Sequence, residues 1–443
     1  MEPRSPLDKV RFWNICAAVV ILGLALSPAI QDSLHRSKEY DAAPGIPVDF
    51  PHYYMAGRLA RLKPPENLLY YLPPDRIARS FIDLRIDAAT PYGRHPPGSG
   101  LPEPFVTLPF DAPPFAALVM EPLASLQWQA AYFVWQLMCV LMMMATLYFA
   151  LRLSLDGPPT TLVMAIGFAV AFLFLPFKFA QTVGNIDVLL LFLWVLGVFF
   201  LGRGHPLPSA FCFALGTAVK VSPVFALPLL AVRRQWRWFA WYAVCSAALL
   251  LVSVWGVGWH NQVVWARQVV PALSCGIKNL GNRSLAGLIP ALRNPQGISI
   301  FLPVPPGLCF LNKTLSGICY CAFLYWCWRQ RKDARGLLFE IILLPLVVLL
   351  VSPISWRQYF VLAVLPLTYL WVRSRDQAVA VSKLDLILLT ISTLTFGMPL
   401  PDYRVARVLG TQLELLVMGA WVGATLALLW VGMRMYKSCV AAG

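Results

Sequence analysis

Residues 127–151 read QWQAAYFVWQLMCVLMMMATLYFAL, without one Asp, Glu, Lys or Arg. At 1.5 Å per residue, a helix of this length crosses the ~30 Å hydrocarbon core of a bilayer. Other apolar segments of spanning length lie near 12–31, 160–178, 187–202, 237–258, 308–328, 336–352, 358–372, 383–399 and 411–433. We therefore predict an all-α polytopic membrane protein of about twelve transmembrane helices, with residues 1–443 forming a single integral membrane domain.

Composition supports this class. The chain is 58% hydrophobic and only 13% charged, whereas soluble domains carry about 25% charged residues. The net charge of +15 comes from basic clusters where short loops meet spans, such as Arg233, Arg234 and Arg237. This is the positive-inside pattern, so these loops are predicted to be cytoplasmic and nucleic acid is not an expected partner. Residues 12–31 are too long for a cleaved signal and are predicted to remain as the first span.

Three segments do not fit simple spans. Residues 32–112 form a long first outer loop, in which 51–62 has the spacing of a short interfacial helix. Residues 113–126 are apolar but too short to cross, which indicates a re-entrant segment. Residues 259–306 form a second outer loop. The stretch 72–112, rich in Pro, Gly and Arg, is an insertion to which we assign no role.

Two short apolar helices, about 208–219 and 222–232, flank Lys220-Val221-Ser222-Pro223. This turn is predicted to lie at membrane depth, where irregular backbone requires a cavity or a protein lining. Lys220 is then an intramembrane cation that either marks a functional cavity or snorkels to the interface.

Asp49 is the main catalytic candidate. It precedes Pro51 in the first outer loop, so it could cap the helix that begins there. Its carboxylate could also act as a general base that takes the proton of an acceptor hydroxyl. The two roles are compatible, because a helix N-terminus favours the ionised carboxylate.

The second outer loop carries only positive charge, at Arg267, Lys278, Arg283 and Arg293. Such a loop needs an anionic partner, either lipid headgroups or a lipid-linked phosphate, since Arg binds phosphate oxygens in a bidentate manner. Cys275 and Cys309 lie in or near this loop, so a disulfide between them is possible. The remaining cysteines show no metal spacing, and no metal or cofactor is implied.

Two further outer turns carry polar groups. In Ser352 to Tyr359, Trp356 either anchors the interface or offers a flat face to a sugar or polyprenyl chain, and Arg357 could complete a phosphate clamp. Gln181 to Asn185 forms a similar turn with two amides.

Six motifs together resemble glycosyltransferase family 87, a class of multispan enzymes that use polyprenyl-phosphate sugars. In chain order they are Val48 to Ala56, Pro113 to Ala116, Gln181 to Leu190, Leu215 to Pro223 with Arg233-Arg234, Asn282 to Leu285, and Ser352 to Trp356. The match departs from the family pattern at Arg357-Gln358, where that pattern often has acidic or histidine residues, and at Ala112, where it has an aromatic.

The resemblance implies a GT-C-type bundle and a hexosyltransferase that moves a sugar, most readily mannose, from a polyprenyl-phosphate donor to a glycolipid or glycan acceptor. The reaction would be an inverting displacement on the outer, periplasmic face of a bacterial-type inner membrane. Asp49 would be the base, and Lys220, Arg283 and Arg357 would balance the charge of the phosphate. The expected substrate contacts are Tyr53, Tyr54, Gln181, Asn185, Asn282 and Trp356.

A different class of function fits some of the same features. A secondary transporter or lipid flippase would also use an apolar bundle, a broken hairpin and an intramembrane cation such as Lys220. Against it, the sequence shows no inverted repeat, and two large outer loops are more than transport requires. Membrane lipids are partners in either case.

Overall fold

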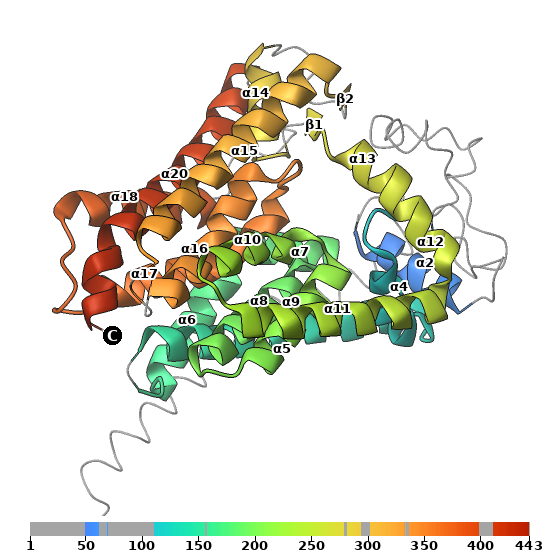
Figure 1. Cartoon of the computed structure of the whole chain (residues 1–443), viewed down its shortest axis with the longest axis horizontal. Coiled ribbons are helices and arrows are strands. Elements are labelled where there is room, and N and C mark those ends of the chain that lie inside the picture. Colours follow the sequence, from blue (N-terminus) through green and yellow to red (C-terminus); the bar gives the residue numbers. More distant parts are fainter. Residues whose placement is uncertain are drawn as a thin grey trace, which may run out of the picture.

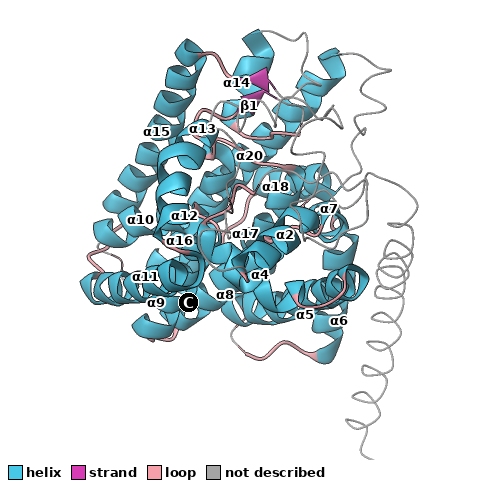
Figure 2. Ribbon diagram, turned by 90° about the vertical axis from the view of Figure 1, so that its right-hand side faces the viewer, coloured by secondary structure: helices cyan, strands magenta, loops and turns pink. Residues whose placement is uncertain are grey.

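The computed structural model describes residues 49–61, 69, 110–155, 157–278, 281–293, 302–331, 333, 336–397 and 411–442. The predicted first span and most of the first outer loop, including nearly all of the 72–112 insertion, lie outside these residues. Figures 1 and 2 show that helices dominate the described part.

The helices and strands, in chain order, are α2 (Phe50–Ala60), α4 (Pro114–Ala124), α5 (Trp128–Ser154), α6 (Thr161–Leu173), α7 (Leu175–Val183), α8 (Asp187–Gly202), α9 (Pro206–Val219), η1 (Ser222–Phe225), α10 (Ala226–Val232), α11 (Trp236–Val257), α12 (Trp259–Val264), η2 (Trp265–Val269), α13 (Val270–Leu273), β1 (Ile277–Lys278), α14 (Leu285–Arg293), β2 (Leu302–Pro303), α15 (Pro306–Arg329), α16 (Gly336–Val351), η3 (Arg357–Ala363), α17 (Val364–Arg373), α18 (Lys383–Gly397) and α20 (Thr411–Ala442).

Several helices have the length and composition of membrane spans. Among the described residues, four qualify outright, namely Trp128–Ser154, Trp236–Val257, Pro306–Arg329 and Leu415–Val440. A bent pair, α6 with α7, would make a fifth. The predicted helical membrane protein is therefore confirmed in its class, while the number of about twelve crossings stays a prediction.

The segment predicted as a span near 160–178 is bent. It is divided into α6 and α7, which meet at 63°. The break falls at Phe174, two residues before Pro176, because a proline in a helix interior removes a hydrogen bond and clashes with the preceding turn. The bend carries the end of α7 toward η3, against which α7 packs.

The predicted hairpin of short helices is confirmed. Helix α9 ends at Val219, Lys220 is extended (φ −155°, ψ 126°), and η1 and α10 continue to Val232. Helix α9 packs between α8 and α11, so the extended residue lies within the bundle rather than in an external loop.

The predicted interfacial helix forms, but it is buried almost all round. Helix α2 packs on α4 (Figure 1), and a Cβ on Gly57 would lie 2.8 Å from the backbone carbonyl group of Met120. Phe50 contacts the rings of Tyr54 and Trp128. The helical spacing indicated a location on the membrane surface, but the aromatic residues of α2 bury their large apolar areas between helices.

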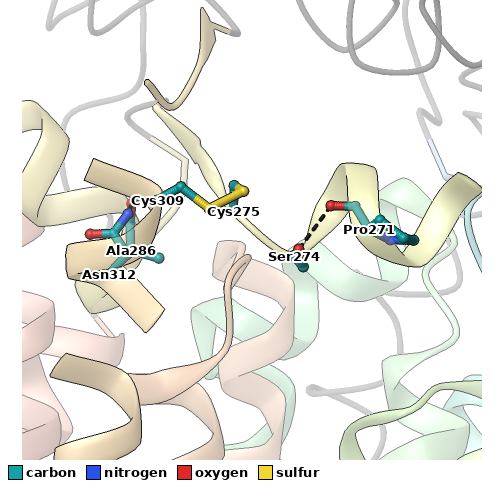
Figure 3. The surroundings of a disulfide bond; sticks show 6 residues. All are labelled: Pro271, Ser274, Cys275, Ala286, Cys309 and Asn312. Carbon is teal, nitrogen blue, oxygen red and sulfur yellow. Dashed lines mark hydrogen bonds between the residues drawn. A yellow bond between two sulfur atoms is a disulfide. The ribbon is translucent and has the colours of Figure 1, made fainter. Parts of the chain in front are cut away.

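The segment predicted as the second outer loop contains regular secondary structure, and its position on the outer side stays a prediction. It contains α12, a π-helical turn η2, α13 and α14, and β1 pairs antiparallel with β2. The disulfide between Cys275 and Cys309, left open by the sequence, is present and ties this unit to the first turn of α15 (Figure 3). Beside it, Asn312 Nδ2 donates to the carbonyl oxygen of Ala286 at 3.2 Å.

A buried ion pair joins three elements at the predicted cytoplasmic end. Arg233, which follows α10, donates through Nε to Glu340 Oε2 of α16 at 2.7 Å and through Nη2 to the hydroxyl of Tyr436 on α20 at 3.2 Å. Its Nη1 donates to the carbonyl oxygens of Gln330 (3.1 Å) and Asp333 (2.8 Å). This member of a basic cluster therefore has a structural partner in addition to its expected role in orienting the chain.

Candidate active site

Asp49 does not serve as a side-chain cap. It stands directly before α2, but its carboxylate makes no hydrogen bond to the first turn of that helix. Its Oδ2 instead accepts hydrogen bonds from Asn185 Nδ2 at 2.6 Å and from Gln358 Nε2 at 3.0 Å. With only 7% of the residue exposed, the carboxylate is enclosed by elements distant in sequence. The predicted role of Asp49 as a general base stays a prediction.

The turn between α7 and α8 is shaped to reach Asp49. Gly184 has φ +69°, and a Cβ there would lie 2.4 Å from the Cβ of Phe50. Only glycine tolerates both this backbone conformation and this close approach. The Asp49 N–H donates to the carbonyl oxygen of Val183 at 3.0 Å, which joins the turn to the start of α2. Asn185 is thereby held beside the carboxylate.

Helix α5 fixes the other side of this turn. Tyr132 donates its hydroxyl to the carbonyl oxygen of Thr182 at 3.1 Å, and Gln136 Nε2 donates to the carbonyl oxygen of Gln181 at 2.6 Å. The side-chain nitrogen of Gln181 is buried and donates to no residue in the described part of the chain. Its predicted role in substrate binding stays a prediction.

Lys220 lies beside the same turn and is ion-paired. Its Nζ lies 2.7 Å from Asp187 Oδ1 and 3.0 Å from Oδ2, and 3.2 Å from the ring centroid of Tyr359. The Lys220 side chain is 20% exposed, whereas that of Asp187 is fully buried. A donor phosphate would have to share this cation with Asp187. The predicted role of Lys220 in phosphate binding stays a prediction.

Burial is the main influence on the pKa of Asp49 and of Asp111, two carboxyl groups that precede helices α2 and α4. It raises the pKa of Asp49 from 3.8 to about 6, against the lowering effect of the Asn185 hydrogen bond; Asp111 raises it further and Lys220 lowers it. Burial likewise raises the pKa of Asp111 to about 6, and Lys220 is the main influence in the opposite direction. Both carboxyl groups are thus poised to exchange protons near neutral pH, as general bases require.

Tyr53 and Tyr54, both predicted substrate contacts, are packed in the aromatic layer around α2. Tyr53 lies 4.1 Å from the ring of His52 and edge-on to Phe110. Tyr54 donates to the carbonyl oxygen of Leu126 at 2.8 Å. These contacts position α2, and a contact of either tyrosine with substrate stays a prediction.

Asn282 and Arg283 join two of the sequence motifs. Asn282 Nδ2 donates to the carbonyl oxygen of Pro353 at 3.0 Å, and its Oδ1 accepts the Ser355 N–H at 2.9 Å. The Arg283 N–H donates to the carbonyl oxygen of Ser355 at 2.7 Å. The Arg283 side chain is 1% exposed, with its guanidinium carbon 5.4 Å from the ring centroid of Trp421. Both residues therefore hydrogen-bond the segment before α14 to the turn that contains Pro353 and Ser355. Their predicted roles in binding stay predictions.

Trp356 and Arg357 are half-buried at the start of η3. The guanidinium carbon of Arg357 lies 5.9 Å from the ring centroid of Phe179 on α7. Since the next residue, Gln358, donates to Asp49, Arg357 lies on the same short element as a ligand of the carboxylate. Of the three predicted phosphate cations, Lys220 acts on the charge of Asp49, Arg357 lies near Phe179, and Arg283 packs against α20.

Within the described residues, no group of three or more His, Cys, Asp or Glu side chains could hold a metal ion. The model of glycosyltransferase family 87 matches residues 111–353, more than half of the chain, and this range includes four of the six motifs in full. The chain belongs to glycosyltransferase family 87. It is therefore an enzyme of the glycosyltransferase class.

Two curated relatives have names that describe their reactions. This family 87 chain is 29% identical over 306 residues, 66% of its length and 69% of the relative's, to the polyprenol-phosphate-mannose-dependent alpha-(1-2)-phosphatidylinositol pentamannoside mannosyltransferase of Mycolicibacterium smegmatis. It is 26% identical over 297 residues, 63% of its length and 66% of the relative's, to the polyprenol-phosphate-mannose-dependent alpha-(1-2)-phosphatidylinositol mannoside mannosyltransferase of Mycobacterium tuberculosis.

Sequence reasoning on this family 87 glycosyltransferase missed three residues of the site. Asp187 lies in the motif Gln181 to Leu190 but was not selected as a site residue. The signal that could have found it is Lys220, because an intramembrane cation requires a counter-ion. Asp111 lies two residues before the double proline Pro113-Pro114 at the start of α4. Gln358 was noted only as a departure from the family pattern, and nothing local in the sequence indicates that it reaches Asp49.

Proposed function

We propose that this glycosyltransferase moves a mannosyl residue from a polyprenyl-phosphate donor to a hydroxyl of a glycolipid or glycan acceptor. The names of both relatives specify a polyprenol-phosphate-mannose donor and a phosphatidylinositol mannoside acceptor, which is a glycolipid. A membrane-embedded donor suits a site enclosed by apolar helices, because the polyprenyl chain can approach through the bilayer.

The observation that carries the mechanism is the enclosed carboxylate of Asp49, which is held by two amides instead of capping its helix. In an inverting displacement, the acceptor oxygen attacks the anomeric carbon while Asp49 takes its proton. The bond from the anomeric carbon to the phosphate oxygen breaks, and its electron pair leaves with the polyprenyl phosphate. A phosphate anion is a stable leaving group, so the step needs no general acid, and Lys220 and Arg357 would balance the developing charge.

This stereochemistry has a definite consequence for the donor. The names of the relatives specify alpha-linked products. A single inverting displacement forms an alpha linkage only from a beta-linked donor. Nuclear magnetic resonance of the anomeric proton before and after one transfer therefore tests the inverting step separately from the sugar.

Two observations support an active site on the outer face. The disulfide between Cys275 and Cys309 is typical of an oxidising compartment, such as the periplasm. The disulfide-bonded segment contacts the turn that leads to Gln358, since a Cβ on Gly276 would lie 2.7 Å from the carbonyl oxygen of Pro353. The site and the disulfide therefore belong to the same end of the molecule.

The test is the substitution Asp49→Asn in protein reconstituted into vesicles. Asn can accept the same two amide hydrogen bonds, but it cannot take a proton. We expect transfer from radiolabelled polyprenyl-phosphate mannose to fall at least a hundredfold, in line with the usual contribution of a general base. Asp376→Asn, in the α17–α18 connection, is the matched control and should retain transfer.

The outcome that rejects the mechanism is transfer by Asp49→Asn at a near wild-type rate. The transporter or flippase alternative has its own readout in the same vesicles. If a solute or lipid crosses the bilayer while polyprenyl-phosphate mannose is never consumed, the enzyme proposal itself is rejected.

A further inference from the structure

Two neutral amides converge on one oxygen of Asp49. Asn185 and Gln358, separated from Asp49 by 136 and 309 residues, both donate to Oδ2. The other oxygen, Oδ1, accepts no hydrogen bond from the residues that the structure describes. The two oxygens of this carboxylate are therefore not equivalent.

The direction of the Asn185 hydrogen bond is fixed by a second contact. Asn185 Oδ1 accepts the N–H of Asp187 at 2.8 Å, at the start of α8. Turning the amide over would place two donors together at Asp187 and two acceptors together at Asp49. Asn185 is thus held as a donor toward Asp49, and a donor favours the ionised form of a carboxylate.

We infer that Asn185 and Gln358 are positioning residues that hold Oδ2 of Asp49 and reserve Oδ1 as the oxygen that takes the acceptor proton. This inference rests on the proposed role of Asp49 as the base. Because both donors are uncharged, they orient the carboxylate without forming an ion pair that would make its proton affinity too low for a base.

The surrounding charges make these donors necessary. Five titratable groups surround Asp49. Two are carboxyl groups, Asp111 before α4 and Asp187 at the start of α8. The others are the cation Lys220 after α9 and the phenols of Tyr53 on α2 and Tyr359 on η3. The two carboxylates disfavour ionised Asp49, and the one cation of the group is bonded to Asp187. Without its amide donors, Asp49 would hold a proton up to a higher pH.

The test is the pH–rate profile of transfer at saturating donor. In the wild type, the acid limb should lie near pH 6, following Asp49. Gln358→Met, which keeps the side-chain length but removes the donor, should move this limb upward by about one pH unit, so transfer at pH 6 falls about fivefold further than transfer at pH 8.5. Gln235→Met, near the opposite end of α11 from the outer unit, is the matched control and should leave the limb in place.

A second variant keeps the test sharp if Gln358→Met does not fold. Asn185→Asp retains an acceptor for the Asp187 N–H but places a negative charge against Oδ2, and it should move the limb in the same direction. Equal loss of transfer at every pH, with the limb unmoved in both variants, would overturn the inference while leaving Asp49 as the base. If Asp49→Asn retains transfer, it is the proposed function that fails.

Discussion

At the scale of single residues, the ionised Asp49 carboxylate destabilises the folded state at the pH where it would serve as a base. Its pKa is raised from 3.8 to about 6, mainly by burial. A carboxyl group whose pKa is higher in the folded state binds its proton more tightly there, so its contribution to stability is present below about pH 4 and is lost as the pH rises through about 6. A pKa difference of about two units corresponds to about 3 kcal/mol.

We therefore expect Asp49→Asn to stabilise the protein while it abolishes transfer. Above pH 7 the substitution removes a buried charge and keeps an acceptor for Asn185 and Gln358, so the free energy of unfolding should rise by about 1–3 kcal/mol. At pH 3.5, below both the unfolded-state pKa of 3.8 and the folded-state pKa of about 6, the difference should shrink toward zero. Thermal unfolding in detergent at both pH values measures it. Destabilisation at pH 8 would show that the charge of Asp49 is compensated by contacts other than the two amides.

At the scale of elements, the α7–α8 turn is set by one glycine. Gly184→Ala places a Cβ 2.4 Å from the Cβ of Phe50 at φ +69°, so either the turn or the start of α2 must move. We expect a destabilisation of about 2 kcal/mol or more and a loss of transfer of at least tenfold, because Asn185 moves away from Asp49.

The control for this prediction is Gly317→Ala in the middle of α15, where an added Cβ meets no atom within 4 Å. Alanine is favoured over glycine in a helix interior by roughly 1 kcal/mol, so this variant should be as stable as the wild type or more stable. Full transfer by Gly184→Ala would mean that the site tolerates a shift of the turn.

The disulfide-bonded outer unit is a second element with a measurable role. Leu273 packs with Ile354, and Gly276 lies against Pro353, so the unit supports the turn that precedes Gln358. We expect Cys275→Ser with Cys309→Ser to lower the free energy of unfolding by about 2–4 kcal/mol and to reduce transfer severalfold, with the helix content retained. Circular dichroism and transfer assays measure both effects.

Cys321→Ser, in the exposed part of α15, is the matched control for the loss of a thiol. Reductant should reproduce the effect of the double substitution in the wild type and have no further effect on the variant. A disulfide-free protein with unchanged transfer would separate the outer unit from the site.

The sequence predicted elements better than it predicted contacts between them. The short helices around Lys220 follow from two apolar runs and a proline, which are local features. Arg283 appeared to be a cation of an exposed loop, because loop length says nothing about the packing of that loop on Ser355 and Trp421. Pro176 was visible in the sequence, yet the apolar content of 160–178 concealed the bend that it causes.

The candidate site was predictable only in part for the same reason. Asp49 could be selected from its motif, and Asn185 from a turn with two amides. Their contact joins residues 136 positions apart, and the one with Gln358 joins residues 309 apart. Hydrophobic periodicity reports which face of a helix is buried, but not which distant turn it meets.

At the scale of the whole molecule, the charge clusters and the disulfide predict one orientation. Arg237, at the start of α11, and Arg293, at the end of α14, are both exposed. In a Cys321→Ser background, a membrane-impermeant maleimide should label Arg293→Cys in intact cells and Arg237→Cys only after permeabilisation. The reverse pattern would place the active site on the cytoplasmic face.

The large sequence separation between Asp49 and Gln358 also determines when, during synthesis of the chain, the site can be completed. A ribosome adds about 5–20 residues per second, so the 309 residues between these partners take roughly 15–60 s to synthesise. During that interval, the carboxylate has been translated but one of its two amide ligands does not yet exist. A chain that stops before Gln358 can insert its first helices into the membrane and still lack a completed site, so the enzyme becomes competent only when most of its length has been made.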